Sequence, residues 1–113
     1  MSAAPSMTAP ADPTVLPDIQ VVEDAETQLD PPSRVLIHND DVTPMDFVVH
    51  VLRSIFELTW VRAEAVMLTA HYSGKALVGV YPLEEAKYKV GQAHGLARAE
   101  GWPLSFTIEP EED

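Results

Sequence analysis

The aromatic residues of this 113-residue chain are confined to one part of it, which places the hydrophobic core there too. Every Trp, Tyr and Phe lies within residues 33–108, together with eight acidic and seven basic side chains. Residues 1–32 hold six acidic residues, six of the ten prolines and no basic or aromatic residue, too little apolar surface to offset chain entropy. We therefore expect a disordered extension over residues 1–32, a folded domain over 33–108 and an acidic tail over 109–113.

The charge of the whole chain excludes several classes of partner. Eighteen acidic residues stand against seven Lys and Arg, and the net charge of −11 repels nucleic-acid phosphates and anionic lipids. The chain has no cysteine, no apolar run long enough to span a membrane, and no Lys or Arg in its first thirty residues to open a secretory signal. We expect a cytoplasmic protein that binds neither nucleic acid nor membranes.

The first half of the folded domain predicts a strand followed by a helix. Residues 34–38 are an apolar run rich in β-formers, and the turn-forming residues 39–41 end it. Thr43, Pro44 and Asp46 resemble a capping box that starts a helix. Helical spacing then places six residues on one buried stripe: Met45, Val48, Val49, Leu52, Ile55 and Phe56.

A second helix is predicted between a cap at Thr59 and a stop at Gly74. Its apolar positions repeat at helical spacing: Ala63, Val66, Met67 and Ala70. Residues 75–81 then alternate as a strand, ended by Pro82. The alternation places Ala76, Val78 and Val80 on one face and Leu77, Gly79 and Tyr81 on the other.

A third helix over residues 83–100, stopped by Gly101, and a last strand over 104–108 complete the domain. The helix turns five residues inward: Leu83, Ala86, Val90, Ala93 and Ala97. The resulting order is β-α-α-β-α-β. It predicts a small α/β sandwich in which a three-stranded antiparallel sheet is covered on one face by three helices.

The polar residues Asn39, Asp40 and Asp41 lie between a strand end and a helix start, where binding sites tend to be found. The alternative is structural: one aspartate caps the helix and the others form an Asx turn. His71, near the end of the second helix, is suited either to a site or to a favourable interaction with the helix dipole. Acceptors at the mouth of an apolar groove between two helices suit a ligand with a positive charge beside a hydrophobic side chain, such as an N-terminal amino acid.

The other reactive residue types point to no catalytic site. His38, His50 and His94 fit structural or exposed positions, and Met45 and Met67 fit the core. No nucleophile–histidine–acid order, phosphate-binding loop or zinc-ligand spacing is present, so an enzyme is the weaker interpretation. A metal site would have to use Asp40, Asp41 and His71, and we expect neither metal nor cofactor.

The folded domain resembles the ClpS adaptor family from about residue 32 to residue 109. The most specific part is the block Asn-Asp-Asp-Val-Thr-Pro-Met at 39–45, flanked by Val35-Leu36-Ile37-His38 and Asp46-Phe47-Val48-Val49. The further matches follow in the right order and spacing: Ala65-Val66-Met67, His71, Gly74-Lys75-Ala76, Gly79-Val80, Lys89-Val90 and Pro103-Leu104.

The resemblance implies an adaptor without catalytic activity of its own. Such an adaptor binds the N-terminal residue of N-degron proteins (Phe, Tyr, Trp or Leu) and delivers them to a Clp AAA+ unfoldase and its peptidase. By position, Asn39, Asp40 and His71 match the residues that bind the substrate's α-amine, and Glu84 and Lys89 match contacts to the unfoldase's N-terminal domain. The hydrophobic pocket, to whose wall Asp40 also belongs, is matched by eight residues: Ile37, Thr43, Pro44, Met45, Val48, Met67, Ala70 and Leu104.

Two further points follow from the resemblance. Ala70 stands where family members usually have Val, which predicts a larger pocket that favours the bulkiest side chains. The implied partners are a ClpA- or ClpC-type unfoldase and the substrate protein, with the adaptor itself monomeric. The competing interpretation is an interaction domain of similar fold, like the C-terminal domain of a ribosomal stalk protein. Such a domain has no need of acceptors around an apolar pocket.

Overall fold

The computed structural model describes residues 30–111 of the chain. The extension predicted over residues 1–32 therefore lies almost entirely outside the described residues, as do the last two residues of the predicted tail. The described part folds in the order β1 (Pro32–His38), α3 (Met45–Ser54), α4 (Trp60–Ser73), β2 (Lys75–Pro82), α5 (Leu83–Ala99) and β3 (Ser105–Pro110). This confirms the predicted β-α-α-β-α-β order.

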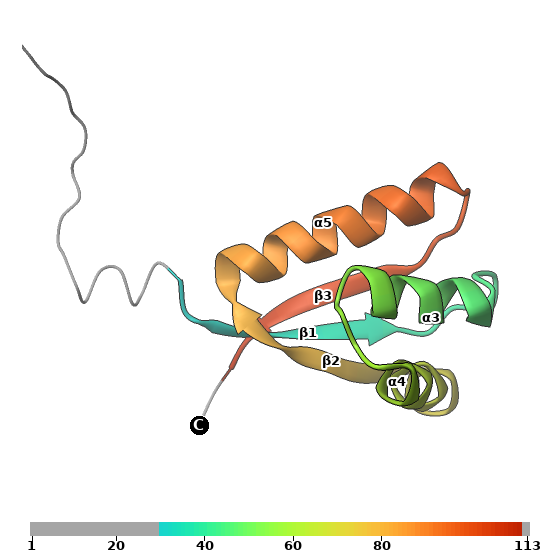
Figure 1. The fold of residues 1–113 in the computed structure, drawn as a ribbon, viewed down its shortest axis with the longest axis horizontal. Coiled ribbons are helices and arrows are strands. Elements are labelled where there is room, and N and C mark those ends of the chain that lie inside the picture. Colours follow the sequence, from blue (N-terminus) through green and yellow to red (C-terminus); the bar gives the residue numbers. More distant parts are fainter. Residues whose placement is uncertain (1–29, 112–113) are drawn as a thin grey trace, which may run out of the picture. The chain divides into compact units, whose positions relative to one another are not determined.

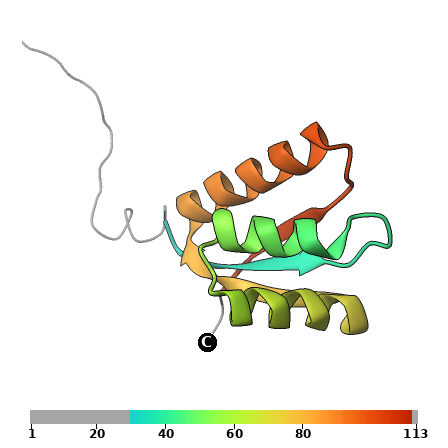
Figure 2. The same cartoon turned by 45° about the vertical axis from the view of Figure 1, so that its right-hand side comes forward.

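The three strands form an antiparallel sheet with β1 in the centre, between β2 and β3 (Figure 1). α5 packs against all three strands, whereas α4 packs against β2 and α3 packs against α4, as the turned view shows (Figure 2). β1 begins at Pro32, two residues before the expected start, and β3 continues to Pro110, because these ends still pair: Ser33 lies opposite Pro110 and Arg34 opposite Glu109.

The hydrophobic core lies between the sheet and the helices. Val35 and Ile37 of β1 and Phe106 of β3 belong to the same buried cluster as the helical residues Val51, Leu52, Ala63, Val66, Ala86, Val90, Ala93 and Ala97. Leu36 and Leu77 lie opposite one another on neighbouring strands but outside this cluster. The helices therefore cover one face of the sheet, as predicted.

The capping box predicted at the start of α3 is wrong. Pro44 occupies the N-cap position without a side-chain hydrogen bond to the helix, and α3 starts at Met45. The Thr43 hydroxyl instead donates a 2.9 Å hydrogen bond to Oδ2 of Asp40. The Thr43 side chain therefore stabilises the turn before α3, and α3 has no side-chain cap.

Met45 is not part of the buried stripe of α3 either, because 46% of its surface is exposed. Met45 is the first residue of α3 and lies at the protein surface, whereas Val48, Val49 and Leu52 are buried as expected. Phe56 is also buried, although the helix ends at Ser54.

The predicted limits of α4 are confirmed by its caps. The Thr59 hydroxyl accepts a 3.1 Å hydrogen bond from the backbone nitrogen of Arg62, the third residue of the helix. Gly74 ends the helix with φ +96°, a left-handed conformation that a residue with a Cβ rarely adopts.

The predicted alternation of β2 is wrong from Gly79 onward. Val35 pairs with Gly79 and Leu36 pairs with Leu77, which leaves Val78 as an extra, bulged residue on β2. An extra residue reverses which face the following side chains occupy. Val80 is consequently exposed, whereas Tyr81 packs against the core, with its ring centre 6.1 Å from that of Phe56.

Candidate functional site

One pocket of about 290 Å³ is lined by the residues predicted to bind the N-terminal residue of a substrate. It is built by the end of β1, the loop after it, the first half of α3, the last turns of α4 and the residue before β3. All three predicted amine-binding residues line it, namely Asn39, Asp40 and His71. All eight predicted wall residues line it too: Ile37, Thr43, Pro44, Met45, Val48, Met67, Ala70 and Leu104.

Three more residues line this pocket that sequence reasoning did not assign to it: His38, Asp41 and Val42. The sequence predicts a structural or exposed position for His38, and its Nε2 lies 2.7 Å from the hydroxyl oxygen of Thr107. For Asp41 the sequence predicts only a turn or, less favoured, a metal-binding role. The signal that could have found all three is their position, because they complete the loop between Ile37 and Thr43.

The Asp40 carboxylate organises the loop before α3. Oδ1 accepts hydrogen bonds from the backbone nitrogens of Val42 (2.8 Å) and Thr43 (2.7 Å), and Oδ2 accepts the Thr43 hydroxyl. This is the turn-forming role that the sequence left open as an alternative. It leaves acceptor capacity unused, because two carboxylate oxygens offer about four lone-pair sites and three are engaged.

These contacts also keep Asp40 ionised. Burial raises the pKa of Asp40, but hydrogen bonds from the backbone nitrogens of Thr43 and Val42, the Thr43 hydroxyl and the positive charge of Arg98 outweigh it. The pKa therefore lies below its ordinary value. The pocket thus carries a negative charge at one edge across the neutral pH range.

The other two predicted amine ligands are exposed and come from different elements. Asn39 follows β1 and is held by the hydrogen bond from its backbone nitrogen to the Gly74 carbonyl, 2.9 Å long. His71 lies in the last turn of α4, with its ring centre 4.9 Å from that of Tyr72 in an edge-on arrangement. The hydrogen bond to Gly74 ties the loop after β1 to the end of α4, which brings both residues to the same pocket.

The apolar wall contains both rigid and adaptable residues. Ile37 and Leu104 are fully buried, and Ala70 and Met67 are nearly so. Leu104 is held from α5, because one Arg98 guanidinium nitrogen donates to the carbonyls of Trp102 and Leu104, each at 2.8 Å. Met45 is half exposed at the mouth, where its unbranched side chain can adapt to a ligand.

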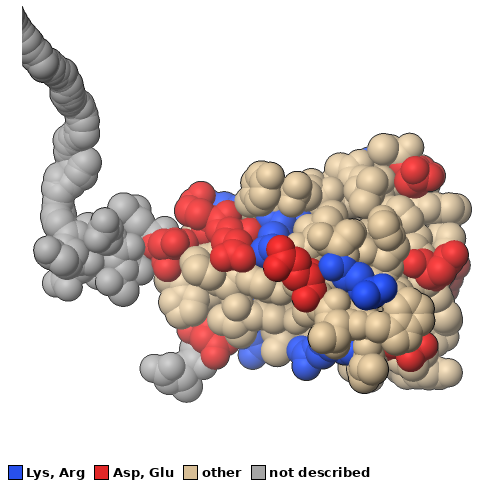
Figure 3. All heavy atoms as spheres, viewed as in Figure 1, with Lys and Arg blue, Asp and Glu red and all other residues tan. Residues whose placement is uncertain are grey.

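Glu84 and Lys89, the predicted unfoldase contacts, do not line the pocket. Both lie in the first half of α5, where charged side chains of both signs gather (Figure 3). The Glu84 side chain is 69% exposed and lies 3.6 Å from Lys87. The Lys89 side chain is only 12% exposed, because its ammonium donates to the Ile55 carbonyl at 3.0 Å and lies between Glu57 and Glu85.

The described residues offer no metal centre: within residues 30–111, no group of three or more His, Asp or Glu residues is placed to hold an ion. Over the same residues, no helix is long and apolar enough to cross a membrane. The fold and the pocket together define a small α/β binding domain. Its pocket combines an apolar wall with hydrogen-bond acceptors at one edge.

The chain belongs to the ClpS family, adaptor proteins of the ATP-dependent Clp protease, whose family model matches residues 28–107. It is 46% identical over 94 residues to the Clp protease adapter protein ClpS of Desulfotalea psychrophila, covering 83% of this chain and 92% of that protein. It is 41% identical over 97 residues to ClpS of Vibrio cholerae, covering 84% and 92%.

A solved structure shows the same fold. The structure of Agrobacterium tumefaciens ClpS2 bound to L-phenylalaninamide matches with a TM-score of 0.69 and 40% sequence identity. The match covers 72% of this chain and 98% of that one. The resemblance stated from the sequence is thereby confirmed.

Proposed function

We propose that this adaptor binds substrate proteins by a large hydrophobic N-terminal residue and delivers them to a Clp AAA+ unfoldase and its peptidase. The observation that carries the proposal is the composition of one pocket: an apolar wall meets the acceptors Asn39, Asp40 and His71. The first side chain of the substrate enters the pocket, and its α-amine meets these acceptors. Phe, Tyr, Trp and Leu are the residues that fit.

The chemistry of an N-terminal ammonium supports this assignment. An ammonium has three donors, so three acceptors are needed to replace the water that it loses on binding. Asp40 has one lone-pair site left after its hydrogen bonds to Val42 and Thr43, and its lowered pKa keeps the carboxylate charged. A charge-assisted hydrogen bond of this kind contributes about 1.5 to 3 kcal/mol.

The apolar wall supplies the second part of the affinity. Burying a Leu or Phe side chain contributes roughly 2 to 3 kcal/mol. After the entropy cost of association, we expect affinities near the micromolar range, about −8 kcal/mol. Affinity in this range suits an adaptor that must release its cargo.

The ligand of the solved relative supports the same assignment. ClpS2 of Agrobacterium tumefaciens is bound to L-phenylalaninamide, which combines a free α-amine, a benzyl side chain and an amide in place of the carboxylate. These are the groups that the first residue of a peptide presents. The identity of 40% over nearly the whole of that chain makes it a close guide to the pocket here.

The delivery step is proposed to use the first half of α5, with Glu84 and Lys89 facing the N-terminal domain of a ClpA- or ClpC-type unfoldase. The exposure of the Glu84 side chain supports a contact role for it. A monomeric adaptor with no catalytic chemistry of its own, working in the cytoplasm, completes the proposal. The absence of cysteine and the acidic composition of the chain agree with it.

Peptides that differ only in their first residue test the proposal. We expect labelled peptides beginning with Phe, Tyr, Trp or Leu to bind near the micromolar range in fluorescence anisotropy, and a Ser-initiated control to bind at least tenfold more weakly. With a Clp unfoldase and peptidase added, a Phe-initiated reporter should be degraded faster in the presence of the adaptor. Equal binding of the Ser and Phe peptides would contradict the proposal.

A further inference from the structure

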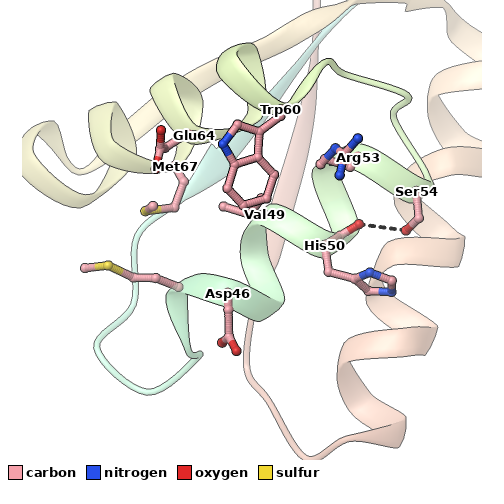
Figure 4. A pocket seen from close by; sticks show the side chains of 9 residues that line it. Asp46, Val49, His50, Arg53, Ser54, Trp60, Glu64 and Met67 are labelled. Atoms are coloured by element: carbon pink, nitrogen blue, oxygen red, sulfur yellow. Dashed lines mark hydrogen bonds between the residues drawn. The ribbon is translucent and has the colours of Figure 1, made fainter.

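A second, larger hollow adjoins the pocket on the same side of the fold. It is a groove of about 600 Å³ between α3 and α4 (Figure 4). Trp60 of α4 projects across it toward Val49 of α3, with Met67 beside them. The groove is an open surface feature: 55% of Trp60 and 46% of Met45 remain exposed in it.

The groove is suited to an apolar ligand. Its apolar surface is provided by Met45, Val49, Trp60 and Met67. The charged residues at its rim carry both signs: Asp46 and Glu64 are acidic, and Arg53 is basic. The Arg53 guanidinium lies 5.5 Å from the centre of the Trp60 ring, so that cation already has a partner. With two carboxylates against one cation, the rim carries a net charge of −1 and disfavours an acidic side chain, while the exposed Met and Trp surfaces remain to be covered.

The groove is continuous with the proposed binding pocket. Met45 and Met67 line both, with the first-residue pocket on one side of them and the groove on the other. The proposed amine ligands Asn39, Asp40 and His71 line only the pocket. A peptide chain that starts at these acceptors and crosses the two methionines therefore reaches the groove.

The geometry of an extended peptide decides which residue arrives there. Successive side chains point to opposite faces, so the first and third side chains share a face and lie about 7 Å apart, whereas the second points away. We propose that the groove binds the side chain of the third residue of the substrate, and that it prefers a large apolar or aromatic one. This inference rests on the proposed function and extends it from the first residue to the third.

A series of peptides, titrated against the wild-type protein, tests which residue of the substrate binds in the groove. All peptides begin with Phe and carry a free amine, and Leu or Phe replaces Ala at either position two or position three. We expect the position-three change to tighten binding about fivefold, the effect of removing about 40 Å² of apolar surface from water. The same change at position two should alter the affinity less than twofold. An equal or larger effect at position two would overturn the inference.

Two variants at the start of α4 test whether the groove is the source of the preference at position three. Trp60→Ser removes the main apolar surface of the groove, whereas Val61→Ser changes the neighbouring residue, which is 75% exposed and does not line the groove. We expect Trp60→Ser to abolish the preference for an apolar third residue. The variant protein should still bind the Phe-Ala-Ala peptide with wild-type affinity. Val61→Ser should behave as the wild type does, and a preference that survives Trp60→Ser would contradict the inference.

Adding an N-terminally acetylated Phe peptide to the series separates this inference from the proposed function. If the Phe peptides bind through their free amine but ignore the third residue, the groove inference is wrong and the proposed function stands. If an acetylated Phe peptide binds as well as the free one, the proposed function fails, and the groove inference fails with it.

Discussion

The backbone nitrogen and the hydroxyl of Thr43 both donate to the carboxylate of Asp40, at 2.7 Å to Oδ1 and 2.9 Å to Oδ2. A single carboxylate therefore holds the turn that precedes α3 and, in the proposed function, also receives the substrate's ammonium. A loss of binding in Asp40→Ala alone does not distinguish the two roles, because that variant removes the turn contacts together with the charge.

Asp40→Asn separates the two roles. The amide oxygen still accepts from the backbone nitrogens of Val42 and Thr43, but the negative charge is gone. We expect the affinity for a Phe-initiated peptide to fall about tenfold or more, while the free energy of unfolding changes by less than about 1 kcal/mol. Asp40→Ala should lower both, with a loss of about 2 kcal/mol or more in binding. Peptide anisotropy and urea unfolding measure the two effects, and wild-type affinity in Asp40→Asn would show that the charge is not used.

Ala70 is expected to set the size of the first-residue pocket. It is nearly buried and lines the pocket one turn from Met67, so Ala70→Val adds two methyl groups to the wall. We expect the affinity for Trp and Phe peptides to fall relative to Leu by about 0.5 to 1.5 kcal/mol. Titration of Leu-, Phe- and Trp-initiated peptides against both proteins gives the ratio. An unchanged Trp-to-Leu ratio would mean that residue 70 does not limit the pocket.

His94 makes the stability of the domain depend on pH. Its Nε2 accepts a 2.9 Å hydrogen bond from the backbone nitrogen of Phe106 in β3, which requires the neutral ring. Burial, reinforced by the positive charge of Arg98, lowers the pKa of His94 below its ordinary value of 6.5. Below pH 6.5 the unfolded chain therefore takes up a proton before the folded one does.

The lowered pKa of His94 adds to the free energy of unfolding. This contribution should be fully present above about pH 6.5 and should be lost as the pH falls from there toward the lowered pKa of the folded state. The slope for one proton cannot exceed about 1.4 kcal/mol per pH unit. His94→Gln retains an acceptor but does not titrate, so urea unfolding at pH 7.5 and 5.5 should show a larger loss for the wild type. Parallel losses in both proteins would rule out His94 as the cause.

We expect the main role of Lys89 to be in stabilising the fold, ahead of any contact with a partner. Its ammonium donates to the Ile55 carbonyl just after α3, in a largely buried position. Lys89→Ala should therefore lower the free energy of unfolding by about 1 to 2 kcal/mol. Glu84→Ala changes an exposed pair with Lys87 and should cost less than about 0.5 kcal/mol. If Lys89→Ala melts as the wild type does yet no longer binds the unfoldase, its main role is at the interface.

The sequence predicted those elements whose signals are local. The cap at Thr59 and the glycine at residue 74 each depend on one or two neighbours, and both lie where they were expected. The bulge at Val78 escaped prediction because alternation alone cannot reveal an extra residue; pairing with β1 reveals it. Thr43 does not cap α3 because Pro44 occupies the N-cap position, and the Thr43 hydroxyl donates to Asp40 instead, a contact that the spacing does not reveal.

The same difference between local signals and long-range contacts explains which parts of the candidate site could be predicted. The family resemblance named eleven residues that the fold brings to one pocket, although they come from three separate stretches of the chain, 37–48, 67–71 and residue 104. The near-burial of Lys89 was not predictable, because it depends on the loop after α3, far away in the sequence. The groove beside Trp60 was missed as well, since it exists only where α3 and α4 pack together.

In the proposed function, the pocket recognises a free α-amine attached to a large hydrophobic residue. The most direct test compares one Phe-initiated peptide with the same peptide acetylated at its N-terminus, by fluorescence anisotropy against the wild-type protein. Acetylation removes the positive charge and two of the three donors and leaves the side chain unchanged. We predict that acetylation weakens binding at least tenfold, and equal affinity for the two peptides would contradict the account.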